Sequence, residues 1–217
     1  MAARFSFDGS QPLLDNGPNS VSTSASNYAI VSARIQNGIS IKSTSPSYFQ
    51  ASGFVPLGIA NQSFSISFWI KPTSRSGTIV HQSDSSSGSG FCITYLGFAS
   101  NGSLISQVLT NTGYVSIAYS DLPLTTFSHV VQTWSTTNGL TLYIDNVLIA
   151  TKTAVTTQAS ASWVNYLTLG SCLNGCGTCN SGQVSSGQFT GIIDDFRLYS
   201  RELSATDVCA LYALGFI

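Results

Sequence analysis

Apolar residues occur along this chain in short runs in which large side chains alternate with small or polar ones. In residues 64–70, FSISFWI, four large apolar side chains alternate with two serines and a tryptophan. This period of two is typical of a β-strand with one face on a core. The same features, bounded by Gly, Pro, Asn or Ser, predict more than ten short strands and hence an all-β sandwich. The expected strands lie at residues 4–8, 28–35, 38–43, 47–52, 64–72, 77–83, 91–98, 104–109, 115–120, 129–134, 140–151, 166–170 and 191–200.

Two local patterns refine this prediction. Residues 140–151 read as a hairpin, and the Asp145–Asn146 pair suits a type I′ turn because both residue types tolerate positive φ. Only the stretch from residue 204 to 214 has helical spacing. Ser204 followed by Asp207 three residues later is a variant of the capping box, so we expect a short helix that packs on the sandwich.

Length and charge exclude several classes of protein. The chain has 217 residues, which one sandwich domain commonly fills, and we expect a single domain over residues 1–217. Charged residues make up 8% of the chain and the net charge is -1, so no basic face is available for nucleic acid. The apolar runs are far shorter than the roughly 20 residues that cross a bilayer, so no membrane span is expected. The first ten residues lack the apolar core of a secretory leader, which was removed, left out or never present.

The five cysteines predict disulfides. Cys172, Cys176 and Cys179 lie in a glycine-rich stretch, and Cys92 and Cys209 lie far from it in sequence. We expect one or two disulfides and one leftover thiol, which could also join two chains. The alternative is zinc, for which the three clustered cysteines would need a fourth ligand from another cysteine or a histidine.

Two sequons, at Asn61 and Asn101, are candidate glycosylation sites. Together with the cysteines and a surface rich in Ser, Thr, Asn and Gly, they favour an extracellular, secreted or cell-surface location.

Four segments now add up to a resemblance to a known family. They are FSFDG, FSISFWIKP with GTIVHQ, SHVVQTW with LTLYIDNVLIAT, and GQFTGIIDDFRLYSRELSATDVCALY. In this order they resemble the laminin-G-like branch of the concanavalin A-like lectin/glucanase superfamily, from Phe5 to Tyr212. The last segment is the most specific, since members typically read Gly-x-Ile-Asp-Asp and continue into a Leu-Ser helix start. The chain departs from the family in having Asn146 where Gly is usual and Phe127 where Trp is common.

The resemblance implies a jelly-roll sandwich of two antiparallel sheets, with the first and last strands side by side and a short C-terminal helix. Within the last strand, simple alternation places Asp194 on the same face as Ile192, Phe196 and Leu198, in line with core residues. A buried carboxylate without a partner costs several kcal/mol. Asp194 therefore needs a partner that stabilises its buried carboxylate.

Calcium is one candidate, because it prefers oxygen ligands such as carboxylates. Relatives of this kind often hold a calcium ion near the N-terminal loop and the last strand, and on that resemblance the candidate metal ligands are Asp8, Asp15 and Asp194. A salt bridge or hydrogen-bond network with Arg4, Arg34 or Arg197 is a second candidate. A β-bulge that turns both aspartates toward solvent is a third.

The motifs of catalysis are missing from the sequence. Glucanases of this superfamily carry a Glu-x-Asp-x-Glu strand motif, whereas Glu202 is the only glutamate here. We interpret His129 as a structural histidine, and His81 leads into a serine-rich loop. Neither a nucleophile elbow nor a phosphate-binding loop occurs. We therefore expect a non-catalytic protein.

Two non-catalytic functions fit the sequence. The first is a binding or adhesion module for a glycan or an extracellular protein, for which Tyr114, Tyr119, Trp163 and Tyr166 are the candidate ligand-binding residues. Each could equally cover the edge of the sandwich. The second is a structural subunit that assembles with its own copies into a fibre, coat or matrix. A net charge near zero and the scarcity of lysine on strands favour it, and residues 19–38 could pair with a neighbour.

Overall fold

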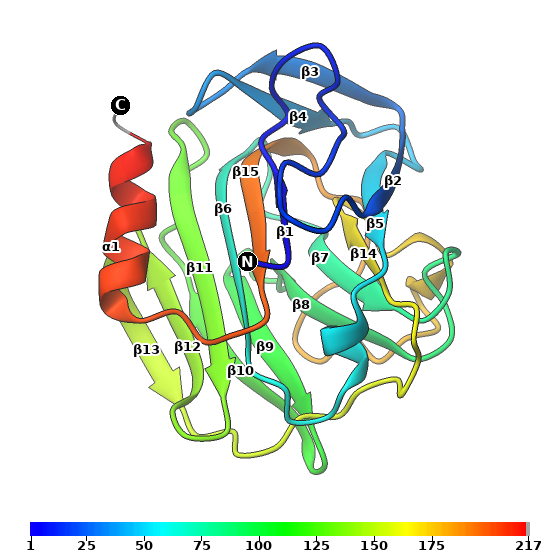
Figure 1. Ribbon diagram of the computed structural model, residues 1–217, viewed down its shortest axis with the longest axis vertical. Helices are drawn as coiled ribbons and strands as arrows, with labels where there is room; N and C mark the ends of the chain where they lie inside the picture. The colour runs from blue at the N-terminus through cyan, green and yellow to red at the C-terminus, as the bar shows by residue number, and fades with distance from the viewer. Residues whose placement is uncertain (216–217) are drawn as a thin grey trace.

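The chain folds as two stacked antiparallel sheets (Figure 1), seen in a computed structural model that describes residues 1–215. This confirms the predicted jelly-roll sandwich. The first sheet contains, in spatial order, β13 (Val147–Lys152), β12 (Gly139–Ile144), β11 (Ser128–Ser135), β6 (Phe64–Pro72), β15 (Gly191–Tyr199), β4 (Asn37–Ile41) and β3 (Tyr28–Ser32), with β1 (Ala3–Phe5) paired to β15. The second contains β10 (Gly113–Tyr119), β9 (Leu104–Thr110), β8 (Cys92–Phe98), β7 (Thr78–Ser83), β14 (Tyr166–Leu169), β5 (Tyr48–Ser52) and β2 (Ser22–Ser26).

The core lies between the sheets, where the alternating apolar positions of the strands meet. The four large apolar residues of the 64–70 stretch are all buried there, as the period of two predicted. Phe5 of the first strand pairs with Phe196 of the last, and their rings stack at 6.4 Å between centroids. The first and last strands are therefore neighbours, as the resemblance implied. The sequence pattern did not predict β2, because its residues STSAS offer no apolar alternation.

The α-helix α1 (Ala205–Leu214) covers the outer face of the first sheet beside β11 (Figure 1), and two short 3-10 helices, η1 (Val55–Gly58) and η2 (Leu173–Gly175), lie in loops. Its capping box is present as predicted, with the Ser204 side chain and the Asp207 side chain each bonding the other residue's backbone. The Ser65 hydroxyl donates to the Arg201 carbonyl and accepts from the Leu203 N–H, which ties the segment before α1 to β6. Within residues 1–215 no helix is long and apolar enough to cross a membrane.

The β12–β13 hairpin has the predicted turn. Asp145 and Asn146 take φ values of 50° and 64°, in the left-handed region that a type I′ turn requires. The Asp145 carboxylate accepts a 2.7 Å hydrogen bond from the His129 N–H, so this aspartate stabilises the turn.

The predicted face of Asp194 was wrong, because β15 carries a bulge. Asp194 pairs with Trp69 and Arg197 pairs with Ser67, so two residues of β15 stand opposite one residue of β6. The extra residue, Asp195, has a φ of 45°. The bulge shifts the alternation by one position. Phe196 and Leu198 therefore face the core together with Ile193, while Asp194 faces the outer side of the sheet.

Candidate binding site

The outer face of the seven-stranded sheet is free of charged side chains. None of its seven strands, as the structure describes them, contains Asp, Glu, Lys or Arg. On β5 and β14 the apolar residues Phe49, Ala51, Leu167 and Leu169 point into the core. The alternate positions of these strands therefore present polar side chains to the outside.

Two adjoining hollows lie on this face, one over β2, β5 and β14 and one beside Tyr48 of β5, and together they are called the groove here. Their volumes are about 220 Å³ and 550 Å³, and both are lined by Ser86. Most of the lining side chains are hydroxyls or amides. The groove residues are Ser22, Thr23, Ser24, Ser45, Pro46, Tyr48, Gln50, Ala51, Ser52, Ser86, Ser87, Tyr166, Ser171, Leu173, Asn174, Cys176, Gly187 and Gln188.

Two half-buried tyrosines, Tyr48 and Tyr166, stand at opposite ends of the groove. Tyr166 lies opposite Ser52 in the β14–β5 pairing, and Tyr48 lies four residues before Ser52 on the same strand. At about 3.3 Å per residue, this places the two rings roughly 13 Å apart along the strand direction. The groove is therefore longer than a single sugar ring.

The floor between the tyrosines is held by amide side chains. The Gln50 amide nitrogen donates to the Thr168 hydroxyl at 2.9 Å and to the Ser86 carbonyl at 3.1 Å. The Gln188 amide nitrogen donates to the carbonyls of Ser47 and Gly170, at 2.8 Å and 2.9 Å. These bonds tie strands and loops together and leave the serine hydroxyls of the groove as its adaptable polar groups.

Two disulfides hold the wall of the groove, which is formed by residues 84–91 and 171–183. Cys92 is joined to Cys179, and Cys172 to Cys176, while Cys209 on α1 is free and exposed. The expectation of one or two disulfides with a leftover thiol is thus confirmed. The Asn174 N–H donates to the Ser87 carbonyl at 2.9 Å, so the two loops are also joined by their backbones.

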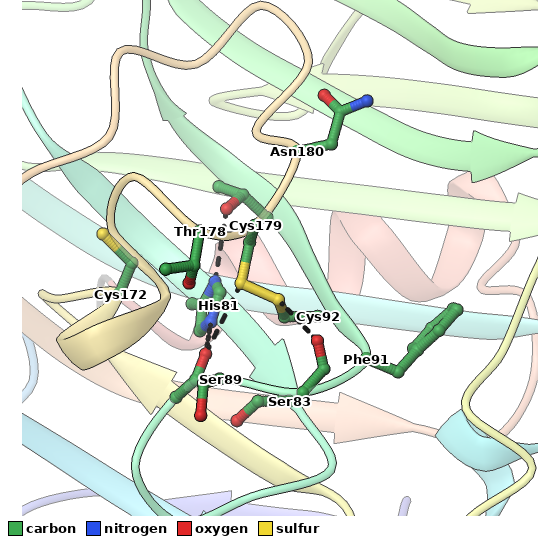
Figure 2. Close-up of a disulfide and its surroundings, with 12 residues drawn as sticks. His81, Ser83, Ser89, Phe91, Cys92, Cys172, Thr178, Cys179 and Asn180 are labelled. Atoms are coloured by element: carbon green, nitrogen blue, oxygen red, sulfur yellow. Dashed lines mark hydrogen bonds between the residues drawn. A yellow bond between two sulfur atoms is a disulfide. The ribbon is translucent and has the colours of Figure 1, made fainter.

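His81 of β7 fixes the same wall from below. Figure 2 shows its imidazole beside the Cys92–Cys179 disulfide. The Nε2 atom lies 2.8 Å from the Gly88 carbonyl, which can only accept, so Nε2 carries the proton. Nδ1 then accepts from the Thr94 hydroxyl at 3.2 Å. Burial lowers the pKa of His81, and the Gly88 bond opposes that shift, so the neutral ring is a structural support.

Gly88 and Gly175 allow the two loops to approach closely. A Cβ on Gly175 would lie 2.3 Å from the Gly88 carbonyl oxygen and 2.9 Å from His81 Nε2. Gly88 has a φ of 83°, which glycine adopts without strain. The wall therefore depends on the absence of side chains at both positions.

The four predicted ligand-binding aromatics do not form one site. Only Tyr166 lines the groove. Tyr114 and Tyr119 lie on β10, at the far edge of the sheet, and the Tyr114 hydroxyl donates to the Asn180 carbonyl. Trp163 lies in the connection between β13 and β14 and is 82% exposed.

Sequence analysis missed Tyr48, Gln50 and Asn174 as groove residues. A signal for two of them is present, because Tyr48, Gln50 and Ser52 alternate with core residues on β5. Asn174 carried no such signal, since the disulfides decide where its loop lies.

The structure separates Asp15 from the other two candidate calcium ligands, Asp8 and Asp194. Asp194 is fully buried, its Oδ2 accepts from the Ile35 N–H at 2.7 Å, and its Oδ1 has no hydrogen-bond partner among the described residues. Burial raises the pKa of Asp194 to about 7; the Ile35 N–H opposes this rise, and the charges of Asp195 and Asp8 add to it. The charge of Asp8 acts on Asp194, and Asp8 Oδ1 accepts from the Asn37 N–H, so the orphaned Asp194 Oδ1 is the atom that a calcium ion would bind here.

Asp15 does not share that arrangement. Its two oxygens accept hydrogen bonds from the backbone N–H groups of Arg4, Gly17 and Val21, so it folds the N-terminal loop. Arg4 and Arg197 do not form the predicted salt bridge with Asp194, because both pair with Asp195, at 2.8 Å and 2.6 Å from its oxygens. The bulge exists, yet both Asp194 and Asp195 remain buried, so it does not turn them toward solvent.

The remaining predicted residues lie outside the groove. Asn61 and Asn101 are both exposed, and their Oδ1 atoms accept from the N–H groups of Thr157 and Ser103. Glu202 accepts from the Asn138 amide beside α1. His129 is buried, and its Nε2 lies 2.9 Å from the Ser67 hydroxyl, as its interpretation as a structural histidine anticipates.

Comparison with known proteins identifies the family. A family model described as the concanavalin A-like lectin/glucanases superfamily, of the laminin G type, matches residues 43–209. The chain belongs to this superfamily. The match spans β5 to α1 and confirms the resemblance drawn from the sequence. No curated protein matches this laminin-G-like chain in sequence.

Solved structures with the same fold include several binding domains. The botulinum neurotoxin serotype G binding domain aligns with a TM-score of 0.70 at 17% identity, over 98% of this chain and 50% of that chain. This laminin-G-like chain thus spans about half the length of the neurotoxin binding domains. Domain 4 of AbnA, a GH43 extracellular arabinanase from Geobacillus stearothermophilus solved with arabinotriose, aligns with a TM-score of 0.63 at 18% identity, over 97% of each chain. At such identities the likeness is one of fold.

Proposed function

We propose that this laminin-G-like domain is a non-catalytic, extracellular binding module that holds a glycan in the groove across β2, β5 and β14. One observation carries the proposal: a hydroxyl-lined floor runs between Tyr48 and Tyr166. Aromatic rings stack on the C–H faces of sugars, and hydroxyls and amides bond the sugar hydroxyls. The wall pinned by disulfides keeps the groove preformed, which lowers the entropy cost of binding.

Two further features support this proposal. A retaining glycosidase needs two carboxylates about 5 Å apart, whereas no carboxylate lines the groove and Glu202 lies between β15 and α1, beside β12 and β13 of the other sheet. Two disulfides favour an oxidising, extracellular compartment. Among the structural neighbours, domain 4 of AbnA was solved with arabinotriose.

The test is a binding measurement on oligosaccharides with variants of the groove. Tyr48→Ala and Tyr166→Ala are each expected to weaken binding by about fivefold, since a favourable contact with an aromatic ring contributes on the order of 1 kcal/mol. Trp163→Ala and Tyr119→Ala are the matched controls and should bind as the wild type does. Loss of binding in the controls, with the groove variants unchanged, contradicts the proposal.

A second candidate function has an observation of its own. The predicted pairing segment, residues 19–38, supplies β2 and β3, which are edge strands of the two sheets. At the opposite edge of the seven-stranded sheet, β10 also lacks Lys, Pro and any charge. Unguarded edges of this kind can add strands from another chain. We therefore propose, as the alternative, a subunit that assembles edge to edge with copies of itself.

We also propose that Asp8 and Asp194 hold a structural calcium ion. The ion would supply a positive charge to the buried Asp194 carboxylate and would leave the groove chemistry to the groove residues.

A further inference from the structure

The charges of this molecule are distributed unequally between its two sheets. Arg4, Lys71, Lys152, Asp194 and Arg197 all lie on strands of the eight-stranded sheet. The strands of the seven-stranded sheet contain no Asp, Glu, Lys or Arg. Their one histidine, on β7, is buried and neutral. None of the residues that line the groove is charged either. The outer face of a sheet is ordinarily where charged residues are found, so this face is unusual.

The nearest charges along the chain have opposite signs. Lys42 is exposed and precedes Ser45 and Pro46 at one end of the groove. Asp84 precedes Ser86 at the wall, and its carboxylate accepts from the Phe91 N–H at 3.0 Å. These two residues have opposite signs, and neither is among the residues that line the groove.

Such a groove treats neutral and acidic sugars differently. A neutral sugar exchanges hydrogen bonds with water for hydrogen bonds with serine hydroxyls and the Asn174 amide, and it covers the tyrosine rings with C–H groups. A carboxylate or sulfate loses hydration in the groove and finds no cation there, which makes its transfer unfavourable. Binding sites for acidic groups generally supply arginine or lysine, and this groove has neither.

We infer that the groove selects neutral oligosaccharides and rejects acidic ones, such as sialylated, sulfated or uronic-acid chains. This inference rests on the proposed function, because it concerns the ligand of the same groove. It also gives a reason for the absence of charge on all seven strands, which stacking on two tyrosines would not by itself require.

The test uses pairs of oligosaccharides that differ only in an acidic group. The pairs are N-acetyllactosamine with its sialylated and sulfated forms, and galactose oligomers with galacturonate oligomers. Arabinotriose is a further neutral probe without an acidic partner. For at least one neutral probe that binds, the acidic partner is expected to bind about tenfold more weakly or worse, which corresponds to 1.4 kcal/mol. Binding of the neutral probe should not change between low and high salt, because no ion pair forms.

A pair of lysine variants locates the selectivity. Ser24→Lys adds a cation inside the groove on β2, and Ser32→Lys adds the same charge at an exposed position on β3, outside the groove. Ser24→Lys is expected to gain affinity for the acidic probes, and Ser32→Lys should not.

The outcomes separate the two proposals. Acidic probes that bind the wild type as tightly as their neutral partners overturn the selectivity and leave glycan binding in place. If no probe of either class binds, glycan binding in the groove is overturned, and the selectivity is overturned with it. If neutral probes bind but the two lysine variants respond alike to acidic probes, the ligand does not lie in the groove and the inference fails.

Discussion

Asp194 and Asp195 are adjacent in sequence, yet the bulge in β15 gives them different surroundings. Asp195 is paired with Arg4 and Arg197, whereas Asp194 has one backbone donor and one oxygen without a partner. The two arginines offset the cost of burying the Asp195 carboxylate. The Asp194 carboxylate has no ion pair of similar strength among the described residues. The pKa of Asp194, raised to about 7, records this difference.

Asp194→Asn is expected to change how stability depends on pH. In the wild type the folded chain keeps a proton on Asp194 between pH values near 4 and 7, where the unfolded chain has released it. Stability without calcium should therefore fall, relative to the variant, as the pH rises through this range. A shift of about three pKa units corresponds to roughly 4 kcal/mol. Urea unfolding of both proteins in EDTA, at several pH values, measures the difference. A constant difference from pH 4 to 8 would contradict it.

Calcium is expected to raise the stability of the folded chain at pH values where the charge of Asp194 lowers it. At pH 7 and above, calcium is expected to raise the wild-type melting temperature, because the ion binds the charged carboxylates of Asp8 and Asp194. Asp194→Asn and Asp8→Asn should lose most of this rise, and Asp15→Asn, measured relative to its own lower stability, should keep it. An equal response of wild type and Asp194→Asn in thermal melts would exclude calcium at this position.

Among the elements, those defined by local sequence were predictable and those defined by distant contacts were not. The alternation of β6, the capping box of α1 and the positive φ values at Asp145 all follow from neighbouring residues. The bulge at Asp195 was only one of three alternatives in the sequence, because it depends on how β15 pairs with β6. The groove was missed for the same reason, since its floor and its wall come from segments that only the fold and the disulfides bring together.

The two disulfides are expected to contribute unequally to stability. Cys92–Cys179 joins residues 87 apart, and Cys172–Cys176 joins residues four apart. The chain-entropy model gives roughly 4–5 kcal/mol for the longer loop and about 2 kcal/mol for the shorter. Denaturant unfolding of the Cys92→Ser/Cys179→Ser and Cys172→Ser/Cys176→Ser proteins should show this order.

The Cys172→Ser/Cys176→Ser protein should stay folded and bind glycan more weakly, because Leu173 and Asn174 line the groove within the released loop. The reverse order of stability would argue against this role of the long-range disulfide.

At the scale of the whole molecule, the two sheets have different surface chemistry. The eight-stranded sheet carries the arginine and aspartate network and is covered in part by α1. The seven-stranded sheet is free of charge and carries the groove. A charge-free sheet suits a neutral ligand, and its unguarded edges at β2 and β10 also suit contact with another copy.

Light scattering across a concentration series distinguishes these two uses of the sheet. A binding module is expected to remain monomeric at all concentrations, in calcium and in EDTA alike. A self-assembling subunit should grow into large particles, and Ala118→Lys on the exposed side of β10 should stop that growth. Growth that this lysine does not affect would rule out assembly through β10.

The most direct test of the central claim is a nuclear magnetic resonance titration of the ¹⁵N-labelled chain with a neutral oligosaccharide that binds it. We expect the largest amide shifts at Tyr48, Gln50, Tyr166 and Asn174, with little change at Trp163 and on β12 and β13. Shifts centred on Trp163 or on the outer face of the eight-stranded sheet, with the groove unchanged, would contradict the account.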